Sequence, residues 1–240
     1  MDIITTTFKG YPATIIRPDH PNGKWIWKTE FLFAFDQVER SLVDEGYTRV
    51  CYHISNKYGS YRAVRLMHDF YQYFVKEYDL EPKGTMIGFS RGGLYAFNFA
   101  LYYPEYVEKM YLDAPVLDMR DWPPADSEER QGVYEEYCLT PETIETFGGH
   151  PIENLEEYFA LGIPTLLVAG DTDEIVSYEK NSGKMLDYCS QNQIPITAYV
   201  KKGCGHHPHS LSDVSPAVDF VVNDPVSVCR WMDEDEWSES

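Results

Sequence analysis

The chain has few basic residues, few cysteines and no long hydrophobic run. Only 20 lysine and arginine residues stand against 39 aspartate and glutamate residues, which gives a formal net charge of −19. Nucleic acids and anionic membrane surfaces repel such a polyanion, so we expect neither as a partner. No apolar run approaches the length of a transmembrane helix. None of this argues against a small neutral substrate.

The five cysteines are odd in number and widely spaced, and no two of them form a C-x-x-C pair. The sequence therefore predicts reduced thiols and no cysteine-based zinc motif. The first residues lack the basic and apolar regions of a secretory signal peptide. From these absences we expect a cytoplasmic protein.

Short apolar runs alternate with segments of helical periodicity along most of the 240 residues. Strands are predicted at 5–8, 13–17, 25–27, 48–54, 84–89, 106–112, 165–170 and 196–200, and helices at 31–45, 60–80, 94–102, 179–192 and 216–222. This alternation favours one α/β domain with a doubly wound, mostly parallel central sheet. Reactive groups in such sheets gather at the carboxyl ends of the strands.

Two stretches depart from this alternation. Residues 119–159 are acidic, rich in proline, glycine and aromatic residues, and without strand character. We expect them to form a lid of short helices inserted within the single domain 1–240. Residues 233–240 are acidic and polar, which predicts a disordered tail.

The pentapeptide Gly88-Phe89-Ser90-Arg91-Gly92 lies where an apolar run ends and a predicted helix begins. A G-x-S-x-G at this place is typical of a nucleophile elbow, a strained strand-to-helix turn that exposes a serine. The glycines leave room where the strand and helix nearly touch, and the helix N-terminus points its free N–H groups at the serine oxygen. The alternative is a turn in which Ser90 only caps the helix.

Two further polar residues follow strand ends later in the chain, Asp173 and His206. A serine hydroxyl needs a base to take its proton, histidine provides one, and a carboxylate orients the histidine and stabilises the imidazolium. The chain order Ser90, Asp173, His206 is the order found in α/β-hydrolases. The three residues are therefore predicted to form a catalytic triad.

The sequence resembles the α/β-hydrolase superfamily of esterases, lipases and peptidases over roughly residues 5–222. Gly170-Asp171-Thr172-Asp173-Glu174-Ile175-Val176 is similar to the superfamily's acid turn, and Gly203-Cys204-Gly205-His206 is similar to its histidine loop. More narrowly, the sequence resembles bacterial hydrolases often found among carbohydrate-degrading genes. The stretches that carry this narrower resemblance are Ser90–Leu94, Asp113–Val116, Asp118 with Trp122, and Gly205–Leu211.

Several assignments stay open at this point. The acid could also be Asp171, or Asp113 or Asp118 after the preceding strand, because some hydrolases of this fold use that position. The base could be His207 instead of His206. His206, His207 and His209 also lie close enough in sequence to ligate a metal, but no carboxylate-rich ligand spacing accompanies them. His209 is otherwise expected to orient its loop.

The oxyanion hole is expected to use the backbone N–H of Arg91 and one N–H from the loop after the third strand. This sequence has Lys28-Thr29-Glu30-Phe31 where the superfamily has a His-Gly pair, and Glu30 is the donor we predict within that tetrapeptide. Aromatic residues that could line a substrate pocket are Tyr58, Trp122, Trp25 and Trp27, of which Tyr58 and Trp122 are our choice.

The hypothesis is a serine hydrolase that cleaves carboxylic esters through an acyl-enzyme. This hypothesis implies no metal or organic cofactor. The resemblance and the aromatic residues point to short acyl groups on a carbohydrate or another small alcohol. An amidase or peptidase would use the same triad, and a lyase on this fold would keep it. A non-catalytic binding protein would leave the triad incomplete or misaligned. A homodimer is possible, and the sequence does not decide it.

Overall fold

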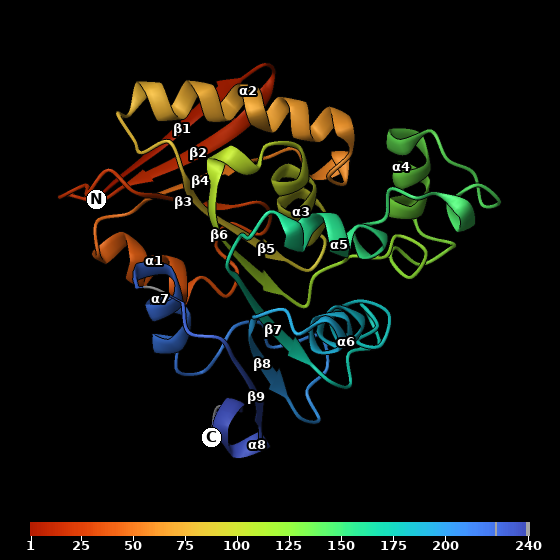
Figure 1. The fold of residues 1–240 in the computed structure, drawn as a ribbon. Coiled ribbons are helices and arrows are strands. Elements are labelled where there is room, and N and C mark those ends of the chain that lie inside the picture. The colour runs from red at the N-terminus through yellow and green to blue at the C-terminus, as the bar shows by residue number, and fades with distance from the viewer. Residues whose placement is uncertain (224, 239–240) are drawn as a thin grey trace.

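The structure, a computed structural model, describes residues 1–223 and 225–238 (Figure 1). Its centre is one nine-stranded sheet in the order β1-β2-β4-β3-β5-β6-β7-β8-β9. The strands are β1 (Asp2–Phe8), β2 (Tyr11–Arg17), β3 (Trp25–Lys28), β4 (Thr48–Tyr52), β5 (Gly84–Phe89), β6 (Val107–Asp113), β7 (Thr165–Gly170), β8 (Thr197–Lys201) and β9 (Val228–Met232). β1, β2 and β4 pair antiparallel, and all other pairs are parallel. The predicted doubly wound, mostly parallel sheet is confirmed.

Helices cover both faces of this sheet, as parallel strands require. They are α1 (Gln37–Asp44), α2 (Tyr61–Glu77), α3 (Gly92–Tyr102), α4 (Glu128–Tyr137), α5 (Leu155–Ala160), α6 (Ser182–Asn192), α7 (Ser215–Val222) and α8 (Glu234–Trp237), with 3₁₀ turns η1 (Ser55–Lys57), η2 (Pro104–Tyr106), η3 (Ile144–Thr146) and η4 (Pro151–Glu153). The buried apolar residues of α2 and α3 belong to one core cluster, and those of α7 with Val38 and Leu42 of α1 to a second. The two clusters lie on opposite faces of the sheet.

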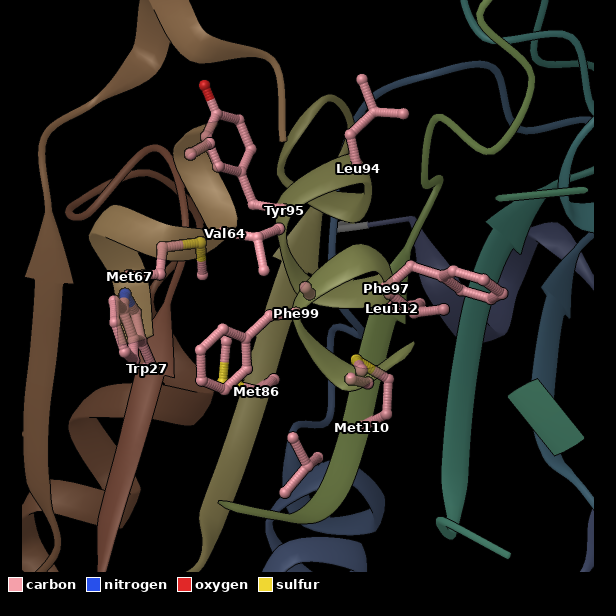
Figure 2. Packing of buried hydrophobic residues seen from close by; sticks show 14 of the residues in the cluster. Trp27, Val64, Met67, Met86, Leu94, Tyr95, Phe97, Phe99, Met110 and Leu112 are labelled. Atoms are coloured by element: carbon pink, nitrogen blue, oxygen red, sulfur yellow. The ribbon is translucent and has the colours of Figure 1, made fainter. Parts of the chain in front are cut away.

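Helix α3 is apolar on all sides, and its residues from 92 to 100 are buried, which is typical of a helix at the centre of a core. Figure 2 shows Phe99 pointing towards Trp27 and Met86, and Phe97 pointing to the other side of the helix. The Phe97 ring stacks on Tyr158 of α5 at 4.3 Å between centroids. The rigid packing around α3 holds the turn that precedes it.

Trp25 and Trp27, which we considered as pocket residues, are core residues instead. Both are fully buried in β3, and both contact the ring of Phe74 on α2 edge-on. The parallel sheet buries both faces of a central strand, so alternate residues of β3 have no route to a substrate.

The predicted helix at 31–45 begins six residues late, at Gln37. Phe31 and Phe35 have left-handed backbones, with φ of 54° and 48°, and cannot continue a right-handed helix. Asp36, at the N-cap position, is held by Arg49 of β4 at 2.9 Å. The apolar spacing of these phenylalanines therefore reflects tertiary contacts and not a helix face.

The predicted disordered tail is wrong for residues 233–238. Helix α8 begins with a capping box between Asp233 and Glu236, and the Trp237 indole donates a hydrogen bond to the Lys202 carbonyl. The preceding strand β9, which the sequence analysis missed, pairs with β8. These contacts offset the conformational entropy that the acidic segment loses when it becomes ordered. Residues 239–240 lie outside the described part of the chain.

Residues 119–159, the expected lid, contain α4, η3, η4 and α5 and no strand among them. In Figure 1 α4 stands at the right edge, away from α1 and α7. The Arg130 side chain ties the segment together by donating hydrogen bonds to the carbonyls of Met119 and Pro123. Glu136 on α4 forms an ion pair with Lys57 of η1 at 2.7 Å, which fastens α4 to the body of the domain.

None of the helices in the described residues is both long and apolar enough to cross a membrane.

The His150 side chain joins separate parts of the 119–159 segment. Its imidazole is fully buried, with Nδ1 accepting from the Met119 N–H at 3.2 Å and Nε2 donating to the Ile144 carbonyl at 2.9 Å. Burial lowers the pKa of His150 below its usual value. Below about pH 6.5 the unfolded chain therefore binds a proton that the folded protein resists, and stability falls as the pH falls through this window.

We expect the free energy of unfolding of the wild type to drop between pH 7.5 and pH 5.5 by more than that of His150→Gln. Urea unfolding at both pH values measures the two differences. His150→Gln will be less stable at pH 7.5, so only the pH-dependent part is compared. Equal losses in both proteins would show that His150 is not the group that senses the pH.

Candidate active site

Ser90 lies between β5 and α3 with a left-handed backbone, φ 50°. Its N–H donates to the Asp113 carbonyl at 2.9 Å, and its own carbonyl accepts from Gly93 and Val116, each at 2.9 Å. This conformation costs a non-glycine residue about 1–3 kcal/mol and persists only where surrounding contacts hold it. The result is the sharp strand-to-helix turn expected from the pentapeptide.

The glycines around Ser90 are needed because of close backbone approaches. A Cβ on Gly88 would lie 2.9 Å from the Gly92 carbonyl oxygen, and a Cβ on Gly92 would lie 2.8 Å from the Thr29 hydroxyl. Thr29 itself donates to the carbonyls of Ile87 and Gly92 at 3.1 and 2.8 Å. The loop after β3 is thereby held directly against the elbow.

The structure brings Ser90, His206 and Asp173 into one hydrogen-bonded row. The Nε2 of His206 lies 3.0 Å from the Ser90 Oγ, and its Nδ1 lies 2.6 Å from Oδ2 of Asp173. Oδ1 of Asp173 accepts from the N–H groups of Ile175 and Val176 at 2.9 and 3.0 Å, which fixes the carboxylate. All three residues are buried. A hydroxyl, an imidazole and a carboxylate thus lie in the order that proton transfer from the serine would require.

Gly170, the last residue of β7, allows the histidine loop to reach Asp173. A Cβ at this position would lie 2.2 Å from the Cys204 carbonyl oxygen and 2.4 Å from that of Gly205. Asp171 also holds this loop, because its Oδ1 accepts from the Gly203 N–H at 2.6 Å. Asp171 therefore contacts the loop backbone and not an imidazole.

The other candidate acids have different partners. Asp118 forms an ion pair with Arg120 at 2.7 Å, and it makes no contact with His206 among the described residues. Asp113 lies 2.6 Å from the Nδ1 of His209, and its other oxygen accepts from the Ser210 N–H at 2.7 Å. Burial alone would raise the pKa of Asp113, but His209, Lys201 and the hydrogen bonds outweigh it and hold this pKa below its usual range.

Of the three neighbouring histidines, His206 is the one that contacts Ser90. His207 is exposed, and its ring stacks on Phe35 at 5.6 Å between centroids. His209 is buried and meets the His206 ring nearly at right angles, at 4.8 Å. The pair Asp113 and His209 is the main feature that we did not predict as a pair. The signal available was that each member lies at or beyond a strand end, Asp113 as the last residue of β6 and His209 in the loop after β8.

Glu30 and Arg91 lie beside the elbow and contact each other. The buried Glu30 carboxylate accepts from Nε of Arg91 and from the Ser55 hydroxyl, at 3.1 and 3.0 Å, while its second oxygen has no partner among the described residues. Burial raises the pKa of Glu30. The Arg91 guanidinium also covers the Phe31 ring at 5.0 Å. The contact between Glu30 and Arg91 ties the loop after β3 to the turn at Ser90.

The backbone N–H groups of Arg91 and Glu30 have no protein acceptor within the described ranges. A Cβ on Gly92 would lie 3.6 Å from the Glu30 nitrogen, so this amide is close to the elbow backbone. The left-handed turn at Phe31 redirects the chain immediately afterwards. Both amides are thus available to a ligand, which is what an oxyanion hole needs.

Tyr58 and Trp122 contact each other, with ring centroids 6.5 Å apart. Tyr58 is buried and Trp122 is half-buried. A Cβ on the neighbouring Gly59 would lie 2.5 Å from the Leu94 backbone, so Tyr58 sits against the first turn of α3. Both residues therefore lie on loops at the elbow end of the sheet.

A separate hollow lies at the opposite, amino ends of β7 and β8. Phe159, Ile163, Ile194 and Phe220 line it, and none of its described lining residues is titratable. It is mainly apolar and holds no group that could transfer a proton. The candidate site therefore remains at Ser90.

Comparisons with known proteins agree with this architecture. The alpha/beta hydrolase fold family matches residues 51–144, which include Ser90 but neither Asp173 nor His206. No curated protein sequence matches the chain.

Solved structures of the same fold are similar at low sequence identity. The fluorophosphonate-binding serine hydrolase F of Staphylococcus aureus superposes with a TM-score of 0.70 at 16% identity, covering 93% of this chain and 98% of its own. A puromycin-hydrolyzing peptidase of Mycobacterium tuberculosis (TM-score 0.67, 12% identity) and a putative dipeptidyl aminopeptidase IV of Bacteroides ovatus (0.65, 15%) cover 85% and 86% of this chain. This chain spans only about a third of their length, 36% and 33%. The protein has the α/β-hydrolase fold.

Proposed function

We propose that this protein is a serine hydrolase that cleaves small-molecule carboxylic esters through an acyl-enzyme. The observation that carries the proposal is the hydrogen-bonded row of Ser90, His206 and Asp173. Its two contacts, 3.0 and 2.6 Å, are within the range for a nucleophile, its base and the acid that orients the base.

In the first step the Ser90 Oγ attacks the ester carbonyl carbon while Nε2 of His206 takes the hydroxyl proton. Asp173 accepts the hydrogen bond from Nδ1–H of His206 and stabilises the imidazolium. The carbonyl oxygen becomes an oxyanion, which we assign to the backbone N–H groups of Arg91 and Glu30. The C–O bond to the alcohol then breaks, and His206 returns the proton to the leaving alcohol.

In the second step water replaces the alcohol. His206 removes a proton from water as the oxygen attacks the acyl carbon, and Ser90 leaves with that proton. The acid product is released and the free enzyme is restored, without any cofactor. Each step uses the same imidazole nitrogen, so the geometry at Nε2 controls both half-reactions.

The substrate assignment rests on Tyr58, Trp122 and the resemblance to hydrolases found among carbohydrate-degrading genes. The two rings contact each other on loops at the elbow end, and Ser90 itself is only 9% exposed. Limited space at a buried serine favours a short acyl group, and flat aromatic rings suit the face of a sugar or another small alcohol. We place the 119–159 segment, which carries Trp122, as the wall of this pocket.

Peptidase activity is the second candidate, because similar structures include a puromycin-hydrolyzing peptidase and a putative dipeptidyl aminopeptidase. Those chains are about three times longer. The ester proposal is preferred because Ser90 is only 9% exposed, which suits a small ester better than an extended peptide.

A fluorophosphonate probe tests whether Ser90 is activated. We expect intact-protein mass spectrometry to show one adduct on the wild type, none on Ser90→Ala, and one on Ser212→Ala, an exposed serine that serves as the control. The reason is that, among the serines of residues 1–223 and 225–238, Ser90 alone has an imidazole in hydrogen-bond contact. Absence of an adduct on the wild type would leave a non-catalytic binding protein as the better interpretation.

The assignment of the acid is tested by three aspartate variants. We expect Asp173→Asn to lower kcat for p-nitrophenyl acetate by about 10⁴-fold, because an amide leaves the imidazole in the wrong tautomer. Asp171→Asn keeps an oxygen for the Gly203 N–H and should change kcat by less than about tenfold. Asp118→Asn is expected to behave like Asp171→Asn. A larger loss in Asp118→Asn than in Asp173→Asn would transfer the acid role to Asp118.

A rate series separates ester from peptide substrates and sizes the acyl pocket. Because the serine is buried, kcat/KM should fall from p-nitrophenyl acetate to octanoate by about tenfold or more, and aminoacyl p-nitroanilides should be slower than the acetate. Ser90→Ala corrects for background hydrolysis. A faster octanoate would contradict the short acyl pocket, and faster anilides would favour a peptidase.

A further inference from the structure

Three imidazoles of the loop after β8 converge beside Ser90. One ring nitrogen from each of His206, His207 and His209 lies within 4.8 Å of the others. The ring centroids are 4.9, 4.8 and 4.9 Å apart, and the ring planes cross at 73°, 79° and 89°. The three rings therefore form a tripod around a common point and do not stack.

This spacing resembles that of three ligands on one tetrahedral ion. Zinc–nitrogen bonds are about 2.0–2.1 Å long, so three such nitrogens lie about 3.4 Å apart and their ring centroids about 5 Å apart. The centroids of the tripod already have this separation. To reach this spacing the nitrogens need to approach one another by at most about 1.4 Å.

In two of the three rings a carboxylate holds one ring nitrogen and leaves the other free to bind a metal. Nδ1 of His206 is held by Asp173 and Nδ1 of His209 by Asp113, each at 2.6 Å. A carboxylate on one ring nitrogen fixes the tautomer in which the other carries the lone pair, and this arrangement is common behind metal-binding histidines. The two buried carboxylates also offset the charge of a dication.

His207 supplies the third position. Its imidazole nitrogens have no hydrogen-bond partner among the described residues, and stacking on Phe35 limits how the ring turns. The catalytic proposal gives this side chain no task. Proton transfer between Ser90 and His206 does not require an exposed imidazole at position 207, whereas a metal site does.

We propose that His206, His207 and His209 form a binding site for one divalent ion of the zinc class. Imidazole nitrogen suits zinc, copper and nickel, whereas magnesium and calcium prefer oxygen ligands. The ion coordinates the lone pair on Nε2 of His206 in place of the hydrogen bond from Ser90, and water completes its coordination. The Ser90 proton stays on its oxygen.

The site is inhibitory and not a cofactor site, because one lone pair cannot hold a metal and accept the serine proton together. Binding of the ion is independent of any activity, whereas the inhibition rests on the proposed function. The bound ion removes the base from both half-reactions, and a chelator restores it.

The test uses protein without a histidine tag, first freed of metal with a chelator. Isothermal titration with zinc sulfate measures the dissociation constant of the wild type, of His207→Gln and of His20→Gln, an exposed histidine on the loop after β2 that serves as the control. Loss of one of three ligands should weaken binding in His207→Gln by at least the roughly 10- to 100-fold that loss of an outer partner costs, and should leave His20→Gln unchanged. Thermal unfolding without metal checks that each variant is folded.

Inhibition is measured in the same proteins as the zinc concentration that halves p-nitrophenyl acetate hydrolysis. It should rise in His207→Gln by the factor found for binding, reverse with chelator, and show no equivalent with magnesium. Equal zinc affinity in His207→Gln and wild type would overturn the site. So would the absence of zinc binding at zinc concentrations up to about 1 mM. Zinc binding that leaves hydrolysis intact would overturn the blocking step. Zinc binding that depends on His207, in a protein without any hydrolysis, would support the metal site and reject the proposed function.

Discussion

The left-handed backbone of Ser90 is the constraint on which the rest of the site depends. Three backbone hydrogen bonds hold this one residue, to Asp113, Gly93 and Val116, and they tie β5 to the end of β6 and to the start of α3. The turn is possible because Gly88 and Gly92 carry no Cβ where backbone and side-chain atoms come within 3 Å. The packing of α3 on all sides then resists relaxation of the turn, and the hydroxyl stays at the edge of the sheet.

The groups of the site lie at or just after the ends of four neighbouring strands. Ser90 follows β5, Asp113 ends β6, Asp173 follows β7, and the histidines follow β8, and these strands lie side by side and parallel. Because parallel strands end at the same edge, each loop contributes one group within reach of the next. The loop after β8 contacts two carboxylates, one through His206 and one through His209. The row of Ser90, His206 and Asp173 therefore has a second imidazole–carboxylate pair against it, and the proposed metal site rests on this pair.

Local pattern was reliable where burial follows directly from it and unreliable where tertiary contacts override it. The continuous apolar run at residues 165–170 is β7, because a strand buried on both faces needs no alternation. The helical spacing of Phe31 and Phe35 did not continue α1, because those residues turn left-handed and Arg49 holds Asp36 at the true start. Polar composition at 233–238 suggested disorder, but pairing of β9 with β8 and the Trp237 contact order it. In each case the deciding partner is distant in the sequence.

The sequence by itself determined the parallel sheet, the elbow at Ser90 and the chain order of serine, acid and histidine, because glycine spacing and apolar periodicity are local properties. Only the tertiary structure decided which histidine contacts the Ser90 hydroxyl and which aspartate contacts that histidine. Residues 90 and 206 are 116 positions apart, and their contact depends on strand order and on how Gly170 lets the Cys204–Gly205 backbone pass. Adjacent histidines such as His206 and His207 are equivalent in sequence. They differ in the folded protein because one side chain points into the sheet edge and the other into solvent, where it stacks on Phe35.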